Sequence, residues 1–251
     1  LAEAGLSVPT QREADGSEAD REFLKQHRAV VVKPADGEQG AGISVDVRTL
    51  RHLRAAIKRA RLEDETVLIE DYCPGEDLRI IVIDFKVVAA ALRRPPEVVG
   101  DGISDVRTLV EKLSRRRAAA THGESRVPLD AETERCIGLA GHNWDDILPA
   151  GQRLQVRKTA NLHTGGHLKD VTAVLHPALR SAAERAARVL DIPVTGLDFL
   201  VPDVTQPEHV IVEANERPGL ANHEPQPTAA RFVDLLFPLS QTPEDPHAQA
   251  A

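Results

Sequence analysis

Three oxygen-bearing side chains near the carboxyl end of the chain, Asp198, Glu213 and Asn215, have types and spacing that suit metal binding. They lie in two apolar runs, VTGLDFLV (194–201) and HVIVEANERPG (209–219), which predict neighbouring strands. Because alternate side chains of a strand share a face, Glu213 and Asn215 point the same way and Asp198 can join them. Hard oxygen ligands of this kind suit Mg²⁺. We therefore predict a magnesium site, although a single acid at a strand end is more often simply exposed.

A second set of residues suits phosphate. Lys33 ends the apolar run AVVVK (29–33), and the glycine-rich segment DGEQGAG (36–42) follows. A lysine ammonium is a compact charge for phosphate oxygens, and glycines let backbone amides approach a polyphosphate. The segment is not a Walker sequence, since no GK[ST] follows it. The alternative is a strand-end lysine with its charge in water and an ordinary turn.

The end of the strand predicted over 67–72 suits a nucleotide base. Glu70, Asp71 and Cys73 precede a Pro-Gly break, and an extended hinge there can offer backbone N–H and C=O groups to an adenine edge. Asp77 can then accept hydrogen bonds from ribose hydroxyls. Each of these residues, taken alone, fits an ordinary surface position equally well.

A further polar set consists of Arg79, Arg157 and Asn161. Arginine is suited to bidentate contact with a carboxylate or phosphate, although any single one is more often a surface ion-pair partner. The glycines at 165 and 166 allow close backbone approach after Asn161. They also argue against a helix carrying His163 and His167, so we do not predict zinc there.

These residues need elements that position them, and the pattern predicts two α+β lobes. Apart from the two acid-bearing strands, apolar runs predict strands over 29–33, 43–47, 67–72, 79–84, 87–93 and 153–158. Helical spacing predicts helices over 48–61, 106–117, 130–140, 177–190 and 228–237, two of them opened by the same five letters, DVRTL (46–50 and 105–109). We expect a small lobe over 1–73, a large lobe over 74–240 and a flexible tail over 241–251. The segment of about 95–155 is an insertion that either binds substrate or covers the sheet.

Composition restricts the classes of function. The 251 residues include 41% hydrophobic and 28% charged residues, and the formal charge of −8 argues against a general nucleic-acid binder. We interpret the one basic run, 115–117, as a solvated helix end. Two distant cysteines, Cys73 and Cys136, indicate a reducing compartment, so we expect the cytoplasm, and no apolar run is long enough to span a membrane. The chain has no methionine, so we expect a piece of a longer protein with an upstream domain. Oligomeric state stays open, with a homo-oligomer possible.

Five motifs occur in an order that resembles the ATP-grasp ligases: KPADGEQGAG, VLIEDYCPGEDLR, RKTANLHTGG, GLDFLV and VEANERPG. The NLHTGG loop and the run R…VVAAALRRP…VVGDG are similar to the branch that contains cyanophycin synthetase and the RimK-type ligases. Two longer stretches, SRRRAAATHGESRVPLDAETERC and NERPGLANHEPQPTAARFVDLLFP, resemble the N-acetylglutaminylglutamine synthetases. The resemblance covers about residues 1 to 238.

The resemblance implies an ATP-grasp fold of class α+β, with ATP between the two lobes. It places ATP phosphates at Lys33 and the glycine-rich loop, adenine at the hinge and ribose at Asp77. It assigns two Mg²⁺ ions, replaceable by Mn²⁺, to the oxygen-bearing trio, and the reacting groups to the arginine set. The implied ligands of ATP are Lys33, Gly37, Gln39, Gly40, Gly42, Glu70, Asp71, Cys73 and Asp77. A phosphate-binding lysine usual in this family would precede Leu1.

The implied activity is an ATP-dependent carboxylate–amine ligase that makes an acyl phosphate and then an amide. The implied partners are small amino-acid or dipeptide substrates, with an N-acetylglutamine-type donor and glutamine as acceptor. Arg157 would stabilise charge on the transferring group. Two alternatives remain: a cyanophycin-type or glutamate-adding ligase, and an ATP-binding regulatory module without turnover.

Overall fold

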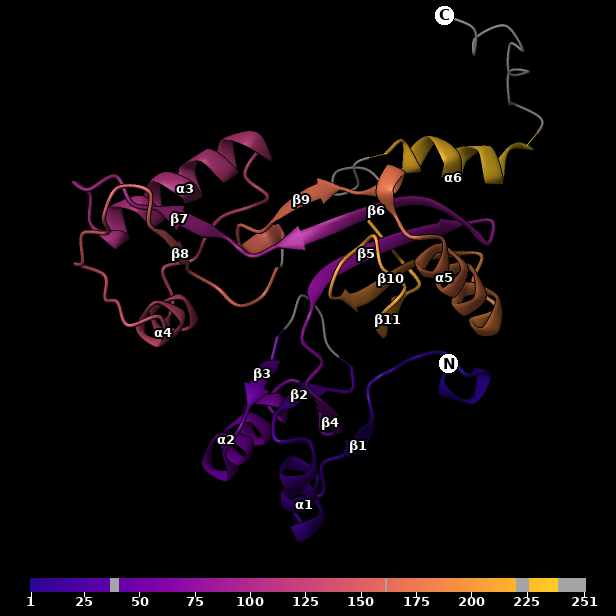
Figure 1. The fold of residues 1–251 in the computed structure, drawn as a ribbon, viewed down its shortest axis with the longest axis horizontal. Coiled ribbons are helices and arrows are strands. Elements are labelled where there is room, and N and C mark those ends of the chain that lie inside the picture. The colour runs from indigo at the N-terminus through magenta and orange to yellow at the C-terminus, as the bar shows by residue number, and fades with distance from the viewer. Residues whose placement is uncertain (37–40, 161, 220–225, 239–251) are drawn as a thin grey trace, which may run out of the picture.

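The computed structural model describes residues 1–36, 41–160, 162–219 and 226–238, and its elements form a smaller lobe, a larger lobe and an inserted unit (Figure 1). The tail predicted over 241–251 lies outside the described residues. Every strand pair of the described chain is antiparallel. None of the helices in these ranges is long and apolar enough to cross a membrane.

The smaller lobe is a four-stranded sheet with two helices on one face, in the strand order β1-β4-β2-β3. Its elements are β1 (Gln11–Glu13), α1 (Glu18–His27), β2 (Val30–Pro34), β3 (Ser44–Val47), α2 (Leu50–Ala60) and β4 (Val67–Asp71). Side-chain caps begin both helices, since Ser17 accepts from the Ala19 amide and Thr49 from the His52 amide. The helices pack on Val30, Val32 and Ile69. The alternation of β2 therefore turns Lys33 to the other face of the sheet.

The larger lobe is a five-stranded sheet in the order β11-β10-β5-β6-β9. Its elements are β5 (Glu76–Ile83), β6 (Lys86–Arg94), β9 (His167–Asp170), α5 (Pro177–Leu190), β10 (Val194–Val201), β11 (Val210–Asn215) and α6 (Thr228–Leu236), with short 3₁₀ turns at Ala2–Ala4, Leu162–Thr164 and Thr172–Val174. The alanine-rich face of α5 packs on Leu78, Ile80 and Leu197. On the opposite face α6 packs only near Ile81 and Ile83. The other half of that face carries polar side chains.

The inserted unit lies beside the larger sheet in Figure 1 and contains β7 (Glu97–Val99), α3 (Val106–Ala120), α4 (Ala131–Leu139) and β8 (Arg153–Gln155). It has a buried cluster of its own, which includes Val98, Val110 and Ile137 and no residue of the larger sheet. The insertion therefore has a core separate from that of the larger sheet, and both interpretations of it, binding substrate or covering the sheet, stay predictions.

Two expectations need correction. Residues 1–8, which we assigned to the smaller lobe, pack on the larger one: Leu6 belongs to its core, and the Ile211 amide donates to the Ser7 carbonyl at 2.8 Å. The basic run 115–117 is not wholly a solvated helix end. Arg115 and Arg116 are exposed, but Arg117 is partly buried and donates to the Gly166 carbonyl. The structure also adds three short strands that we did not predict: β1, β7 and β9.

Candidate active site

A row of charged side chains crosses the polar face of the larger sheet. The strand register pairs Glu213 with Asp198 across β11 and β10, and Asp198 with Arg79 across β10 and β5. Arg79 Nε lies 2.6 Å from Asp198 Oδ1. Cross-strand partners share a face, so the sheet itself brings two carboxylates and a guanidinium together. Asn215, two residues beyond Glu213, lies on the same face opposite Gly196.

Gly196 allows this arrangement because a side chain there would displace the Arg79 guanidinium. A Cβ atom at position 196 would lie 2.4 Å from Arg79 Nη1 and 3.0 Å from Pro218 Cβ. The guanidinium therefore lies over the backbone of β10, where it reaches Asp198. The glycine of the GLDF motif is required by close approach of a side chain, not by an unusual backbone angle.

Arg93, which we did not predict as a site residue, joins the row. Its Nη2 atom lies 2.8 Å from Asp198 Oδ2 and 2.9 Å from Asp77 Oδ1. Asp77, expected to meet a ribose, thus has an arginine partner in this structure. Although burial opposes it, the carboxylates of Asp198 and Asp77 raise the pKa of Arg93 further above its ordinary value. Arg93 is therefore a cation at all accessible pH values.

The electrostatics of the row favour an added cation. Burial and the neighbouring charge of Asp198 raise the pKa of Glu213, while Lys33, Arg79 and Arg93 oppose the rise. Burial also raises the pKa of Asp77, to about 6. A carboxylate whose charge is disfavoured by burial and by a second carboxylate gains from a divalent ion.

The donor set fits a magnesium ion. Asp198 Oδ1 is buried and makes no hydrogen bond, because its short contact with Arg79 lacks hydrogen-bond geometry. Asn215 donates through Nδ2 to the Gly196 carbonyl at 3.4 Å, which leaves its own carbonyl oxygen as a ligand. Within the described ranges, no three His, Cys, Asp or Glu side chains form a metal cluster. The third protein ligand would therefore be the amide of Asn215.

The smaller lobe contributes a lysine to the same region. Lys33 Nζ lies 2.8 Å from Glu70 Oε1, and the Glu70 side chain is only 7% exposed. Glu70 and Glu213 both line a cavity of about 630 Å³, a volume within the usual range for small-ligand sites. Lys33 acts electrostatically on Glu213 across this gap. Each lobe thus contributes one carboxylate to this cavity, and Lys33 lies beside the carboxylate of the smaller lobe.

The remaining predicted ligands of ATP lie around this lysine or outside the described chain. Asp71 approaches His27, with Oδ2 and Nδ1 3.9 Å apart, and burial raises the pKa of the Cys73 thiol. Gly42 has a positive φ of 70°, and a Cβ there would lie 2.9 Å from Glu63 Cγ, so the backbone conformation and the packing both favour glycine here without any bound ligand. Three predicted residues of the glycine-rich loop and one predicted catalytic residue lie outside the described residues: Gly37, Gln39, Gly40 and Asn161.

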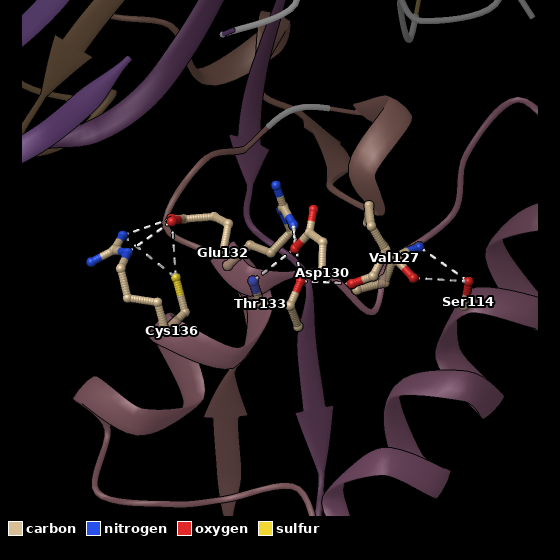
Figure 2. Close-up of polar contacts among 9 residues, drawn as sticks. Ser114, Val127, Asp130, Glu132, Thr133 and Cys136 are labelled. Carbon is tan, nitrogen blue, oxygen red and sulfur yellow. Dashed lines mark hydrogen bonds and ion pairs between the residues drawn. The ribbon is translucent and has the colours of Figure 1, made fainter. Parts of the chain in front are cut away.

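Arg157 lies in the inserted unit and not in the charged row. Its Nη1 atom donates to Asp130 Oδ1 at 2.8 Å and to Thr133 Oγ1 at 2.9 Å. Figure 2 shows Asp130 and Thr133 together at the start of α4, where Asp130 also caps the helix by accepting from the Thr133 amide. The structure thus gives Arg157 partners that fix α4. Its catalytic role stays a prediction.

The raised pKa of Asp77 predicts a pH-dependent stability. A carboxyl group whose folded-state pKa exceeds its unfolded value costs stability as pH rises from about 4 to about 6, and the cost is constant above. We expect Asp77→Asn to gain stability relative to the wild type over that window. The gain should be only a few degrees in Tm, because the side chain is 32% exposed and solvent screens part of the effect.

Thermal unfolding of both proteins between pH 4 and 7 measures this difference. Asp203→Asn is the control, because hydrogen bonds from Thr205 lower the pKa of Asp203, and its difference from wild type should change little above about pH 5. A Tm difference for Asp77→Asn that does not grow with pH would contradict the assignment.

Comparison with known proteins agrees with this architecture. The family described as "Prokaryotic glutathione synthetase, ATP-grasp domain" matches residues 7–115. A cyanophycin synthetase of Nostoc sp. is 34% identical over 226 residues, which cover 85% of this chain and 25% of that protein. The glutathione biosynthesis bifunctional protein GshAB of Listeria innocua is 33% identical over 252 residues, covering 94% of this chain and 33% of that protein.

Among solved structures, a bifunctional glutathione synthetase from Pasteurella multocida superposes with a TM-score of 0.61 at 27% identity, covering 95% of this chain and 35% of that one. The chain has the two α+β lobes of the ATP-grasp fold. It is homologous to cyanophycin synthetases and bifunctional glutathione synthetases. It spans about a quarter to a third of the length of these relatives.

Proposed function

We propose that the protein is an ATP-dependent ligase that joins a carboxylate to an amine through an acyl phosphate. The observation that supports this most is a cavity lined by Glu70, which pairs with Lys33 of the smaller lobe, and by Glu213, which lies across from Asp198 in the charged row of the larger lobe. A polyphosphate needs cations and a metal site, and we propose Lys33 for the first and Asp198, Glu213 and Asn215 for the second.

The residues have distinct tasks in this proposal. Lys33 binds phosphate oxygens, and Asp198, Glu213 and Asn215 hold Mg²⁺, which supplies charge neutralisation for the phosphates. Arg79 and Arg93 each pair with one oxygen of the Asp198 carboxylate and so fix its orientation. Because phosphoryl transfer depends mainly on positioning and charge, this fixed row matters more than an acid or base would.

For the substrates, we propose an N-acetylglutamine-type donor and glutamine as acceptor. This choice follows the resemblance of 114–136 and 215–238 to N-acetylglutaminylglutamine synthetases. The names of the homologues fit a cyanophycin-type alternative equally well, since cyanophycin synthetase covers most of this chain. Both alternatives share the reaction and differ only in the amino acids.

Mass spectrometry of products tests the proposal. The protein in its full natural length is incubated with ATP, Mg²⁺ and either N-acetyl-L-glutamine plus L-glutamine or a panel of other amino-acid pairs, and ADP release is followed. A new amide with stoichiometric ADP supports the ligase, and the productive pair identifies the substrates. Nucleotide binding without ADP release for any pair would favour an ATP-binding module without turnover.

Lys33→Ala should weaken ATP binding about 10- to 100-fold, because one charge-assisted contact to phosphate is lost. Titration calorimetry with Mg-ATP measures the dissociation constant. Lys58→Ala, which removes an exposed lysine of α2, is the matched control. Since Lys33→Ala also leaves Glu70 buried without its partner, the double variant Lys33→Met/Glu70→Gln is measured beside it. Wild-type affinity in both would contradict the placement of Lys33.

A further inference from the structure

A second, smaller cavity lies where the inserted unit meets the segment that leads into β9. It has a volume of about 160 Å³ and is lined by Arg117 of α3, Ser125, Leu162 and Leu168, among others. The Ser125 hydroxyl donates to the Leu162 carbonyl, and the Arg126 amide donates to the His163 carbonyl at 3.0 Å. These contacts join the two segments, so the cavity has fixed walls. Its volume equals that of about five waters, enough for a carboxylate on a short stem.

Arg117 brings an uncompensated positive charge to this cavity. It donates through Nη2 to the Gly166 carbonyl, and its Nε is buried without a hydrogen bond. None of the carboxylates that the structure describes lies within ion-pair distance of Arg117, although Glu124 lines the same cavity. Burial lowers the pKa of Arg117, and no acid opposes that effect. A half-buried guanidinium in this state gains from an anionic ligand.

The surroundings add to this charge. Burial lowers the pKa of His167, and the positive charges of Arg117 and Arg94 lower it further, while Glu97 opposes them. His167 begins β9 opposite Arg94. Arg94 pairs with Glu76, so Arg117 is the guanidinium of this region that has no carboxylate within ion-pair distance among the described residues.

One lining residue of the cavity lies on the same sheet face as the charged row. Leu168, which lines it, is the cross-strand partner of Arg93, so the two side chains share a face. Strand β10, which carries Asp198, is separated from β9 by three strand spacings. The distance between the two strands across the sheet is therefore about 14 Å. An extended residue spans about 3.3–3.6 Å. A phosphoryl group and an amino acid, placed end to end, can cover this distance.

We propose that Arg117 binds a carboxylate of the amino-acid substrate that the reaction leaves unchanged. The inference rests on the proposed ligase function. The donor's reacting carboxyl must lie at the phosphate and the metal ligands, so it cannot also reach the far edge of the sheet. The acceptor keeps its carboxylate while its amine reacts. The subsite at Arg117 therefore suits the acceptor and sets its preference for an acid over an amide.

Arg117→Gln tests the subsite, with Arg116→Gln as the matched control, because the latter removes an exposed arginine from the same helix. For the full-length protein we expect KM for the acceptor to rise about 10- to 100-fold in Arg117→Gln, while KM for ATP stays unchanged. Arg117→Lys should restore part of the loss. A rise in the donor's KM instead would assign the carboxylate to the donor. Equal KM values for Arg117→Gln and Arg116→Gln would overturn the subsite.

Changing the ligand avoids dependence on how the variant folds. Binding of L-glutamine and of L-glutamine amide, which lacks the carboxylate, is measured by calorimetry on the wild type and on Arg117→Gln with the non-hydrolysable nucleotide AMPPNP and Mg²⁺. We expect the amide to bind the wild type about 10- to 100-fold more weakly than the acid, and the variant not to distinguish the two. This result would support the subsite even if no amino-acid pair releases ADP. The absence of ADP release would contradict only the ligase proposal. Equal binding of acid and amide by the wild type, or no binding of either, would overturn the subsite.

Discussion

Replacement of Glu213 by glutamine is expected to lower kcat at least about 1,000-fold and, in the absence of ligands, to leave the fold as stable as the wild type or more so. The loss of activity follows from the removal of a carboxylate that holds Mg²⁺, an effect of several kcal/mol on the transition state. The stability follows from the charge environment. Burial and the neighbouring Asp198 disfavour the Glu213 carboxylate in the folded chain, so a neutral amide of the same shape removes a repulsion.

Two measurements separate these effects. ADP release gives kcat, and thermal unfolding with and without Mg-ATP gives the stabilisation by ligand, which depends on affinity. We expect the wild type to gain several degrees with Mg-ATP and Glu213→Gln to gain little. Glu216→Gln, at an exposed position just past the end of β11, is the matched control and should behave as the wild type. If Glu213→Gln unfolds at a lower temperature and the wild type gains nothing from Mg-ATP, Glu213 is a structural residue.

The part of the site on the two acid-bearing strands could be predicted from the sequence. The acid-bearing strands were predictable because their apolar alternation is strong, and β10 spans Val194–Val201 as expected. Alternation also predicted that Glu213 and Asn215 share a face. A site built from two strands that are adjacent in the sequence depends only on the pairing of those strands. The alternation of side chains along each strand then determines which residues share a face.

Arg93 could not be predicted in the same way because a bulge decides where it points. Near the turn, β5 and β6 pair Val82 with Val87, but the register shifts between Ile81 and Val82, so that Asp77 lies opposite Arg93. Without this extra residue Asp77 would face Leu92, and Arg93 would lie on the other face. A bulge leaves no clear signal in an apolar run, so tertiary structure is needed to locate it.

The repeated DVRTL segments show the same limit in a helix start. Both precede a helix, as predicted, but Thr49 caps α2 in the first copy and Asp105 caps α3 in the second. In the first copy Asp46 has a positive φ of 59° and pairs with Arg48 at 2.7 Å, while Val47 ends β3. The helix cap is thus the fourth residue of the first copy and the first residue of the second copy. The difference arises because strand β3 continues into the first copy.

Loss of the Asp198 charge should have the largest combined effect on stability and activity. In Asp198→Asn, Arg79 and Arg93 keep their positions but lose their shared counter-charge. The side chains of Arg79, Arg93 and Asp198 are only 15%, 18% and 7% exposed. Breaking a buried ion pair by removing one partner costs about 3–5 kcal/mol, so we expect the free energy of unfolding to fall by about that amount.

The contrast with Glu213 makes this prediction specific. Both acids are assigned to the same metal ion, and both amide variants should lose turnover by about 1,000-fold or more. Only Asp198→Asn should be destabilised, because of these two acids only Asp198 lies within ion-pair distance of Arg79 and Arg93. Chemical denaturation measures the difference, with Asp84→Asn in the exposed β5–β6 turn as control, where the positive φ of 53° suits asparagine. The double variant Asp198→Asn/Arg93→Gln should recover part of the stability and none of the activity. Equal stability of Asp198→Asn and Asp84→Asn would show that the arginines do not depend on Asp198, and the row would then be a surface feature.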